Sequence, residues 1–125
     1  MVSFMKQYEA QTYALLRIVA GFLFLWHGSQ KLLSFPTESM AAGYVKYAAG
    51  GIELVGGTLI MIGLFTSPAA FLASGLMAVA YWMAHGTNEI LPILNRGELA
   101  VLYCFVFLYL SSKGDGIWSA GGYKG

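Results

Sequence analysis

The sequence predicts an all-α integral membrane protein, an antiparallel four-helix bundle, and three observations lead to that prediction. Of the 125 residues, 58% are hydrophobic and only 10% are charged, whereas a soluble domain has roughly 25% charged residues. The chain contains four apolar stretches near the length of about 20 residues at which a helix crosses the hydrocarbon core of a bilayer. These stretches lack the alternation of apolar and polar residues that is typical of barrel strands, and open strands cannot satisfy their backbone groups in lipid.

The predicted helices form one domain over residues 1–125, at about 12–34, 47–65, 68–85 and 96–112. The first stretch is too long for the apolar region of a signal peptide and contains Arg17, so we expect a membrane span there. Pro36 ends this helix, because proline cannot continue it. A tight turn at residues 66–68 joins the second and third helices, and the Gly- and Ser-rich tail Lys113–Gly125 is expected to be a loose surface segment.

An internal echo suggests that the bundle consists of two related helical hairpins. Each hairpin has a histidine late in its first helix and a glutamate early in its second: His27 with Glu53, and His85 with Glu98. The match is short, so chance similarity stays an alternative. From the helical rise of about 1.5 Å per residue, His27 and Glu53 lie at nearly the same depth, roughly 9 Å below one surface. The sequence therefore predicts one polar end of the bundle.

Glu53 is the clearest candidate functional residue. An ionised group at mid-bilayer costs roughly 2.5–3.5 kcal/mol on insertion scales, so this carboxyl group must be paired, protonated or in contact with water. His27, or Lys31 one turn further along the same helix face, is its expected partner. Such a pair handles protons or binds a ligand in a small cavity. The alternative is a hydrogen bond that only fixes the register of two helices.

Other residues at the polar end allow two interpretations each. His85 and Glu98 extend the site or lie at the water interface, and Lys31 is either a ligand or a snorkelling lysine. Four aromatic side chains either wall a cavity beside the histidines or belong to an interfacial belt: Trp26, Tyr81, Trp82 and Tyr103.

Arg17 lies near the opposite surface and is expected to be a structural anchor. Its guanidinium group either snorkels to lipid phosphates or pairs with Asp115 beyond the fourth helix. The second helix is rich in glycine, including Gly50 and Gly57, and small residues of this kind let helices approach closely in lipid.

The composition excludes several classes of function. A net charge of +1 without a basic run gives no support for nucleic-acid binding. The single cysteine, Cys104, excludes an internal disulfide and a cysteine-rich metal site. No metal is expected, because the chain lacks the paired Glu-x-x-His motifs of di-iron bundles.

Taken together, these motifs resemble the DoxX family of small bacterial and archaeal membrane proteins. The matching residues occur over about 15–112, in this order: Leu15-Leu16-Arg17, Gly21, Trp26-His27-Gly28, Lys31-Leu32, Gly51-Ile52-Glu53-Leu54-Val55-Gly56-Gly57, Ala84-His85-Gly86 and Gly97-Glu98-Leu99-Ala100. The resemblance implies a four-helix membrane bundle, with motif positions Arg17, His27, Lys31, Glu53, His85 and Glu98. It also implies an association with membrane oxidoreductases, since relatives include a subunit of a thiosulfate:quinone oxidoreductase.

Two functional hypotheses follow, both for a multi-pass protein of the prokaryotic cytoplasmic membrane that acts as a homo-oligomer or in a complex. In the first, the chain is a membrane subunit of an electron-transfer system and binds a quinone at its polar end, while other oxidoreductase subunits supply the electrons. In the second, it is a small-solute or proton carrier, or a structural partner without chemistry of its own. The sequence leaves open whether the chain is catalytic alone.

Overall fold

The computed structural model describes residues 3–35, 43–83 and 97–122, and every regular element in these ranges is helical. The elements are the 3-10 turn η1 (Lys6–Tyr8), α1 (Glu9–Leu33), α2 (Gly43–Gly51), the π-helical turn η2 (Ile52–Gly56), α3 (Gly57–Ile62), α4 (Thr66–Tyr81) and α6 (Glu98–Lys113). The prediction of an all-α fold is confirmed for this part of the chain.

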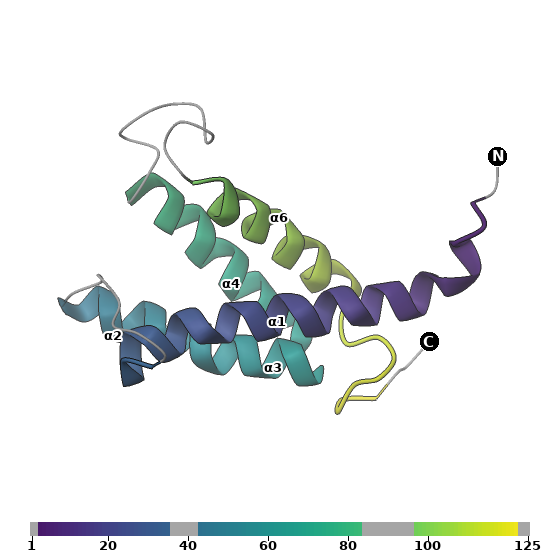
Figure 1. Ribbon diagram of the computed structural model, residues 1–125, viewed down its shortest axis with the longest axis horizontal. Coiled ribbons are helices and arrows are strands. Elements are labelled where there is room, and N and C mark those ends of the chain that lie inside the picture. The colour runs from purple at the N-terminus through teal and green to yellow at the C-terminus, as the bar shows by residue number, and fades with distance from the viewer. Residues whose placement is uncertain (1–2, 36–42, 84–96, 123–125) are drawn as a thin grey trace.

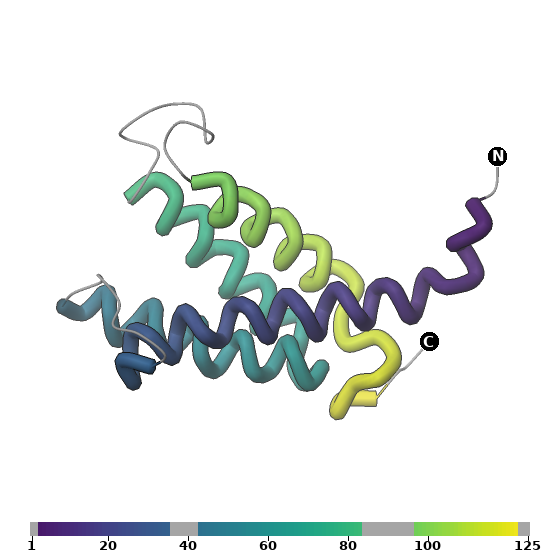
Figure 2. The backbone as a smooth tube through the Cα atoms, viewed as in Figure 1, coloured from purple at the N-terminus to yellow at the C-terminus, as the bar shows by residue number. Residues whose placement is uncertain are grey.

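The helices form two antiparallel hairpins that cross each other (Figure 1). In the first hairpin, α1 packs against α2, η2 and α3, which follow one another without a break. In the second hairpin, α4 packs against α6. The chain path in Figure 2 shows the hairpins meeting where α3 is connected to α4 and diverging towards the end at which α1 finishes.

The first hairpin is held together by a close approach of glycines. A Cβ atom built on Gly21 would lie 2.7 Å from the carbonyl oxygen of Gly57, and one built on Gly28 would lie 2.6 Å from that of Gly50. Gly21 and Gly28 are seven residues apart on α1, and Gly50 and Gly57 are seven residues apart on the second helix. Each pair therefore lies on one face of its helix. The expectation that glycines of the second helix allow tight packing is met at Gly50 and Gly57.

Hydrogen bonds between small side chains and the backbone link the helices of the second hairpin. The hydroxyl group of Ser67 donates to the carbonyl oxygen of Ser111 at 2.6 Å, and that of Ser111 donates back to Ser67 at 3.0 Å. One to two turns away, the hydroxyl group of Ser74 donates to the carbonyl oxygen of Cys104 at 2.7 Å. Such bonds can form only where two helices approach closely, as small residues allow.

Aromatic contacts join the two hairpins near their crossing. Phe24 of α1 and Phe107 of α6 are fully buried, and their ring centroids lie 4.6 Å apart. Ile60 of α3 and Leu110 of α6 are also fully buried in this core. The crossing therefore contains several of the largest fully buried side chains of the described structure.

Left-handed backbone conformations set the helix ends and correct the predicted bounds. The first helix spans 9–33 instead of 12–34, and it ends at Leu33 because Ser34 has φ +54°. The second begins at residue 43 instead of 47 and ends at 62 instead of 65, because Gly63 has φ +74°. Phe65, with φ +52°, precedes α4, which therefore begins two residues earlier than predicted. The fourth helix covers 98–113, close to the predicted 96–112.

The segment after α6 is ordered against both hairpins, so the expectation of a loose tail is wrong for residues 114–122. The backbone N–H of Ala120 donates to the carbonyl oxygen of Ile62 at 2.8 Å. The carboxylate of Asp115 accepts a hydrogen bond from the backbone N–H of Thr66, at the start of α4, at 3.0 Å. The glycines of this tail provide the turns that these contacts require, instead of flexibility.

Large hydrophobic side chains cover much of the outer surface. Phe71 of α4 is 64% exposed and Phe105 of α6 is 63% exposed. Among the described residues, the continuous helix Gly43–Ile62 has 20 residues and is long and apolar enough to cross a membrane, while Thr66–Tyr81 is a shorter apolar helix.

The glycine contact between α1 and α3 yields a stability prediction. Gly21→Ala should lower the free energy of unfolding by about 1–3 kcal/mol, because the new methyl group meets backbone atoms that cannot move aside. Gly51→Ala is the matched control, since its Cβ would meet nothing within 4 Å. Thermal unfolding in detergent, followed by circular dichroism, measures both. Equal losses in the two variants would contradict the packing described for Gly21.

Candidate functional site

A cavity of about 230 Å³ lies between the two hairpins, on the side where they diverge. The helices α1, α4 and α6 and the turn η2 contribute side chains to it. Its lining residues are His27 and Lys31 of α1, Glu53 of η2, Met77 and Ala80 of α4, and Leu99, Ala100 and Tyr103 of α6. We name this cavity the Glu53 pocket.

A single ion pair occupies the polar side of the Glu53 pocket. The Nζ atom of Lys31 lies 2.6 Å from Oε1 of Glu53, and the two side chains are 18% and 3% exposed. The sequence left the partner of Glu53 open between His27 and Lys31, and the structure brings Lys31 to it. Because a buried charge is tolerated only when it is paired, the two groups depend on each other, and together they contribute no net charge to the pocket.

Local backbone features bring Lys31 and Glu53 together. Gly50 leaves room for the stem of Lys31, since a Cβ atom at Gly50 would lie 2.9 Å from the Lys31 Cβ atom. Glu53 lies in η2, a π-helical turn within an otherwise α-helical segment. The wider π turn changes the angular position of the residues that follow it, and such turns occur frequently at functional sites.

Tyr103 forms the aromatic wall of the pocket. Its ring stacks on Phe107 with centroids 5.3 Å apart and an interplanar angle of 4°, and it packs against Phe24 at 5.5 Å. The ring of His27 meets Tyr103 edge-on, with centroids 6.2 Å apart. His27 is half-buried between its own helix and this ring. The contact therefore connects the polar side chains of α1 with α6.

Several expected site residues lie elsewhere. Trp26 packs against Phe22 and Phe35, and Trp82, 64% exposed, stacks on Tyr81; neither indole lines the Glu53 pocket. Both tryptophans lie on exposed sides of the structure. Glu98 is exposed at the first residue of α6 and does not line the pocket either. His85 lies outside the described residues.

Two lining residues, Met77 and Ala80, were not named from the sequence, and Leu99 and Ala100 were named only as part of the motif around Glu98. None of the four carries a polar side-chain group, and only their position on α4 and α6 brings them to the pocket. Tyr103 was named as one of four possible aromatic walls, and it is the one that the structure places in the lining.

Arg17 is fully buried at the other end of the crossing, where it cannot snorkel to lipid phosphates. Its guanidinium group donates to the carbonyl oxygens of Ile60 at 3.0 Å, Asp115 at 2.5 Å, Ile117 at 2.9 Å and Trp118 at 2.7 Å. Arg17 therefore contacts Asp115 through the backbone instead of the carboxylate. These bonds attach the segment after α6 to α1 and α3, in keeping with the expected role of a structural anchor.

The pocket combines hydrogen-bonding groups with apolar walls. The Lys31 ammonium group and the Tyr103 hydroxyl group can donate hydrogen bonds, the Glu53 carboxylate can accept them, and the His27 imidazole can do either. Its volume is below that of a typical drug-sized site, so it suits a single ring or a head group. Among the described residues, no three His, Cys, Asp or Glu side chains come together in a group that could hold a metal ion.

Comparisons with known proteins agree with the resemblance seen in the motifs. The sequence model of the DoxX family matches residues 12–86, a range that includes His27, Lys31 and Glu53. An uncharacterized protein of Haemophilus influenzae is 42% identical over 121 residues, which cover 90% of each chain. No solved structure matches the chain significantly.

The ion pair predicts strongly coupled effects of substitution. Lys31→Met should lower the free energy of unfolding by about 3 kcal/mol, the lower end of the range for breaking a buried pair, because it leaves the Glu53 carboxylate unpaired. Adding Glu53→Gln should restore most of this loss, because the charge without a partner is removed. Chemical unfolding of the two single variants and the double variant in detergent measures the coupling. Additive losses would show that the two side chains do not interact.

Proposed function

The chain belongs to the DoxX family, and we propose that it is a multi-pass membrane protein that binds a quinone ring in the Glu53 pocket as the membrane subunit of an oxidoreductase system. The observation that carries the proposal is the Lys31–Glu53 ion pair, which lies with His27 and Tyr103 in a small cavity between two helical hairpins. The supporting arguments concern the location of the chain, the chemistry of the pocket and the source of electrons.

Placement in the prokaryotic cytoplasmic membrane, as an antiparallel four-helix bundle, fits the outer surface. Exposed aromatic and aliphatic side chains such as Phe71, Leu102 and Phe105 are each more than 60% accessible. In water, a contiguous surface of this kind would favour aggregation, whereas in lipid it contacts acyl chains. The 20-residue helix Gly43–Ile62 matches the hydrocarbon thickness.

The Glu53 pocket offers groups that suit both redox states of a quinone. The two carbonyl oxygens of a quinone accept hydrogen bonds, which Lys31, Tyr103 and His27 can donate. The hydroxyl groups of the reduced quinol donate, and the Glu53 carboxylate can accept. The ion pair has no net charge, which suits an uncharged ring. The apolar side chains of α4 and α6 would contact the faces of that ring. Fixed groups of this kind orient the ring and exchange protons when a redox partner acts on it.

Electrons must come from a partner subunit under this proposal. The sequence has no flavin or dinucleotide fingerprint, and Cys104 is its one cysteine, so it has no cysteine motif for haem attachment or an iron–sulfur cluster. The chain would then hold the quinone and supply proton-exchanging groups, while another oxidoreductase subunit would carry the electrons to it.

A small-solute or proton carrier is the second candidate function, because the pocket lies between two hairpins that diverge (Figure 1). A change in the angle between the hairpins would open such a site to alternate sides. Uptake into proteoliposomes distinguishes this function from the quinone site. A structural partner without chemistry would instead tolerate Glu53→Gln in function and show only lost stability or lost partner binding.

Native mass spectrometry of the detergent-released protein, with extraction and identification of what remains bound, tests the quinone proposal. We expect a quinone at near-equal stoichiometry. After reduction, the quinol should be retained at least about tenfold more weakly by Glu53→Gln, because that variant loses the hydrogen bond from a quinol hydroxyl group to a charged carboxylate. Glu9→Gln is the matched control, since Glu9 is the first residue of α1, does not line the Glu53 pocket and is 61% exposed.

Two outcomes would refute the quinone site. One is a wild-type protein released with phospholipid alone, also after exposure to added quinone. The other is a Glu53→Gln variant that retains the reduced quinol as the wild type does. If Glu9→Gln lost the ligand as strongly as Glu53→Gln does, the loss would reflect a general loss of protein stability instead of a lost contact in the pocket.

A further inference from the structure

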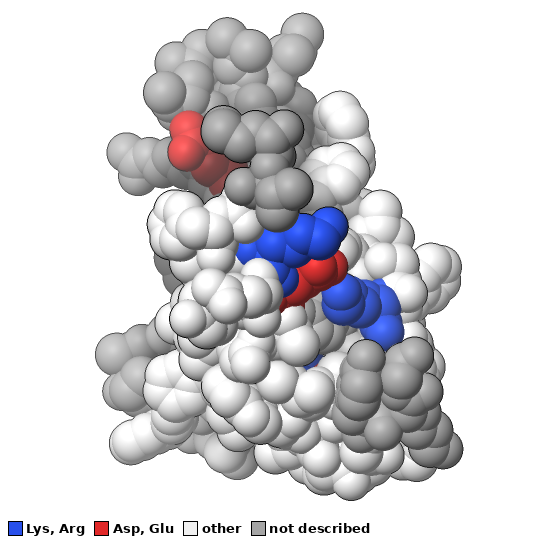
Figure 3. Space-filling view, turned by 90° about the vertical axis from the view of Figure 1, so that its right-hand side faces the viewer, with Lys and Arg blue, Asp and Glu red and all other residues white. Residues whose placement is uncertain are grey.

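A second cavity, of about 390 Å³, lies at the end of the molecule where α1 begins and α6 ends. Lys6, Gln7, Glu9, Ala10, Tyr13, Lys113, Gly116 and Ile117 line it, and we name it the terminal cavity. Figure 3 faces this end and shows basic side chains on both sides of acidic ones, surrounded by uncharged residues. None of the lining residues belongs to the Glu53 pocket.

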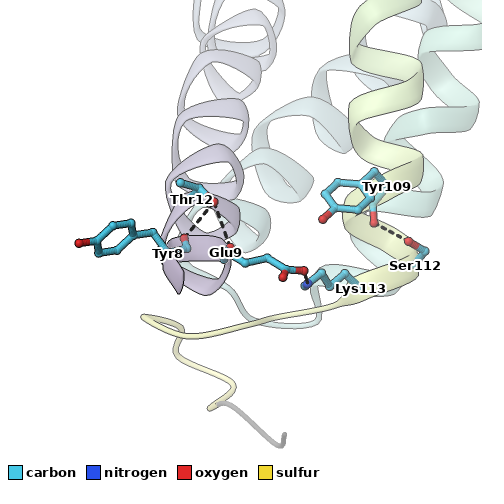
Figure 4. A network of polar contacts seen from close by, with 6 residues as sticks. All are labelled: Tyr8, Glu9, Thr12, Tyr109, Ser112 and Lys113. Carbon is cyan, nitrogen blue, oxygen red and sulfur yellow. Dashed lines mark hydrogen bonds and ion pairs between the residues drawn. The ribbon is translucent and has the colours of Figure 1, made fainter. Parts of the chain in front are cut away.

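The charges of the terminal cavity do not cancel. Lys113 Nζ lies 3.4 Å from Glu9 Oε1, and the two side chains point toward each other from α6 and α1 (Figure 4). At 37% and 61% exposed, they form a weak pair that solvent screens. Lys6 also lines the cavity and contributes a further positive charge. The formal charges of Lys6, Lys113 and Glu9 add up to +1.

The wall of the terminal cavity is rigid. The hydroxyl group of Tyr13 donates to the carbonyl oxygens of Leu110 at 3.1 Å and Gly114 at 2.5 Å. The Lys113 Nζ atom lies 5.3 Å from the centroid of the same ring. Gly116, with φ +70°, packs so closely that a Cβ atom there would lie 3.0 Å from the ring. A ligand would therefore meet a surface that is already in place, which lowers the entropic cost of binding.

Apolar residues next to the cavity indicate the source of its ligand. Phe4 is 82% exposed, Met5 42% and Tyr8 47%, and all three lie within two residues of Lys6. A free anion in water would gain nothing from these side chains. A phospholipid would place its phosphate between the lysines and its glycerol and acyl region against the exposed aromatic and aliphatic groups.

We infer that the terminal cavity binds the head group of an anionic phospholipid, with the phosphate between Lys6 and Lys113. The net charge of +1 complements a head group of charge −1 better than a zwitterionic one. The inference rests on the proposed membrane location. It does not rest on the quinone site, which uses other residues at the diverging end of the hairpins.

Lipid titration followed by native mass spectrometry tests the site, with phosphatidylglycerol and phosphatidylcholine as probes. The wild type should prefer phosphatidylglycerol. Each lysine removed should weaken that binding about fivefold, so Lys6→Gln with Lys113→Gln should weaken it about 25-fold. Glu9→Gln should act in the opposite direction and strengthen binding, because it frees Lys113. Lys46→Gln on α2 is the control of equal charge change and should leave the binding unchanged.

Several results would overturn the inference. The first is equal binding of the two lipids by the wild type, and the second is unchanged phosphatidylglycerol binding in the double lysine variant. The third is an equal loss of binding in Lys46→Gln, which would indicate that the lipid responds to the overall charge of the protein surface. Competition by inorganic phosphate at millimolar concentration would assign the cavity to a free anion. A double lysine variant that loses phosphatidylglycerol but retains quinone would show that this site is separate from the Glu53 pocket. A Glu53→Gln variant that loses the reduced quinol but retains phosphatidylglycerol would show the same.

Discussion

The rest of the structure depends on the need to pair a carboxylate inside an apolar helix. Glu53 is 3% exposed, and Lys31 reaches it at 2.6 Å. That contact requires the backbones of α1 and the second helix to approach closely, which Gly28 and Gly50 allow. The glycine face therefore does more than pack two helices. It places a charge pair at the point where the hairpins diverge, and so creates a neutral but strongly polar surface in an apolar pocket.

Arg17, at the opposite end, is also a buried charge that needs polar partners, but its partners are backbone carbonyl groups instead of a carboxylate. Its guanidinium group is fully buried and is satisfied by four backbone carbonyl oxygens, among them those of Ile60 and Trp118. A carbonyl oxygen has two lone pairs, so the Ile60 oxygen can accept from Arg17 as well as from the backbone N–H of Gly63, and one cation can bind several carbonyl groups. Arg17 thus joins the first hairpin and the segment after α6 at one end of the molecule, and Lys31 with Glu53 lies at the end where the hairpins diverge.

The sequence predicts the all-α fold and the depth of Glu53, because hydrophobic length and helical rise depend on composition and spacing alone. It does not choose between His27 and Lys31 as partner, since the rotation of one helix against another depends on packing. The π turn at Glu53 is also invisible in the pattern, and it shifts which side chains share a face. Trp26 and Trp82 were expected near the histidines because they lie close to them in the sequence, yet both indoles are exposed and neither lines the pocket.

Infrared difference spectroscopy of the wild type against Glu53→Gln, in lipid, measures the central claim most directly. If Lys31 and Glu53 form an ion pair, the substitution removes carboxylate stretching bands and leaves the carbonyl region of protonated acids unchanged. The same bands should respond to Lys31→Met, because that change removes the partner charge. Loss of a protonated-acid carbonyl band in Glu53→Gln would contradict the account, since the pocket would then contain a neutral acid instead of a paired charge.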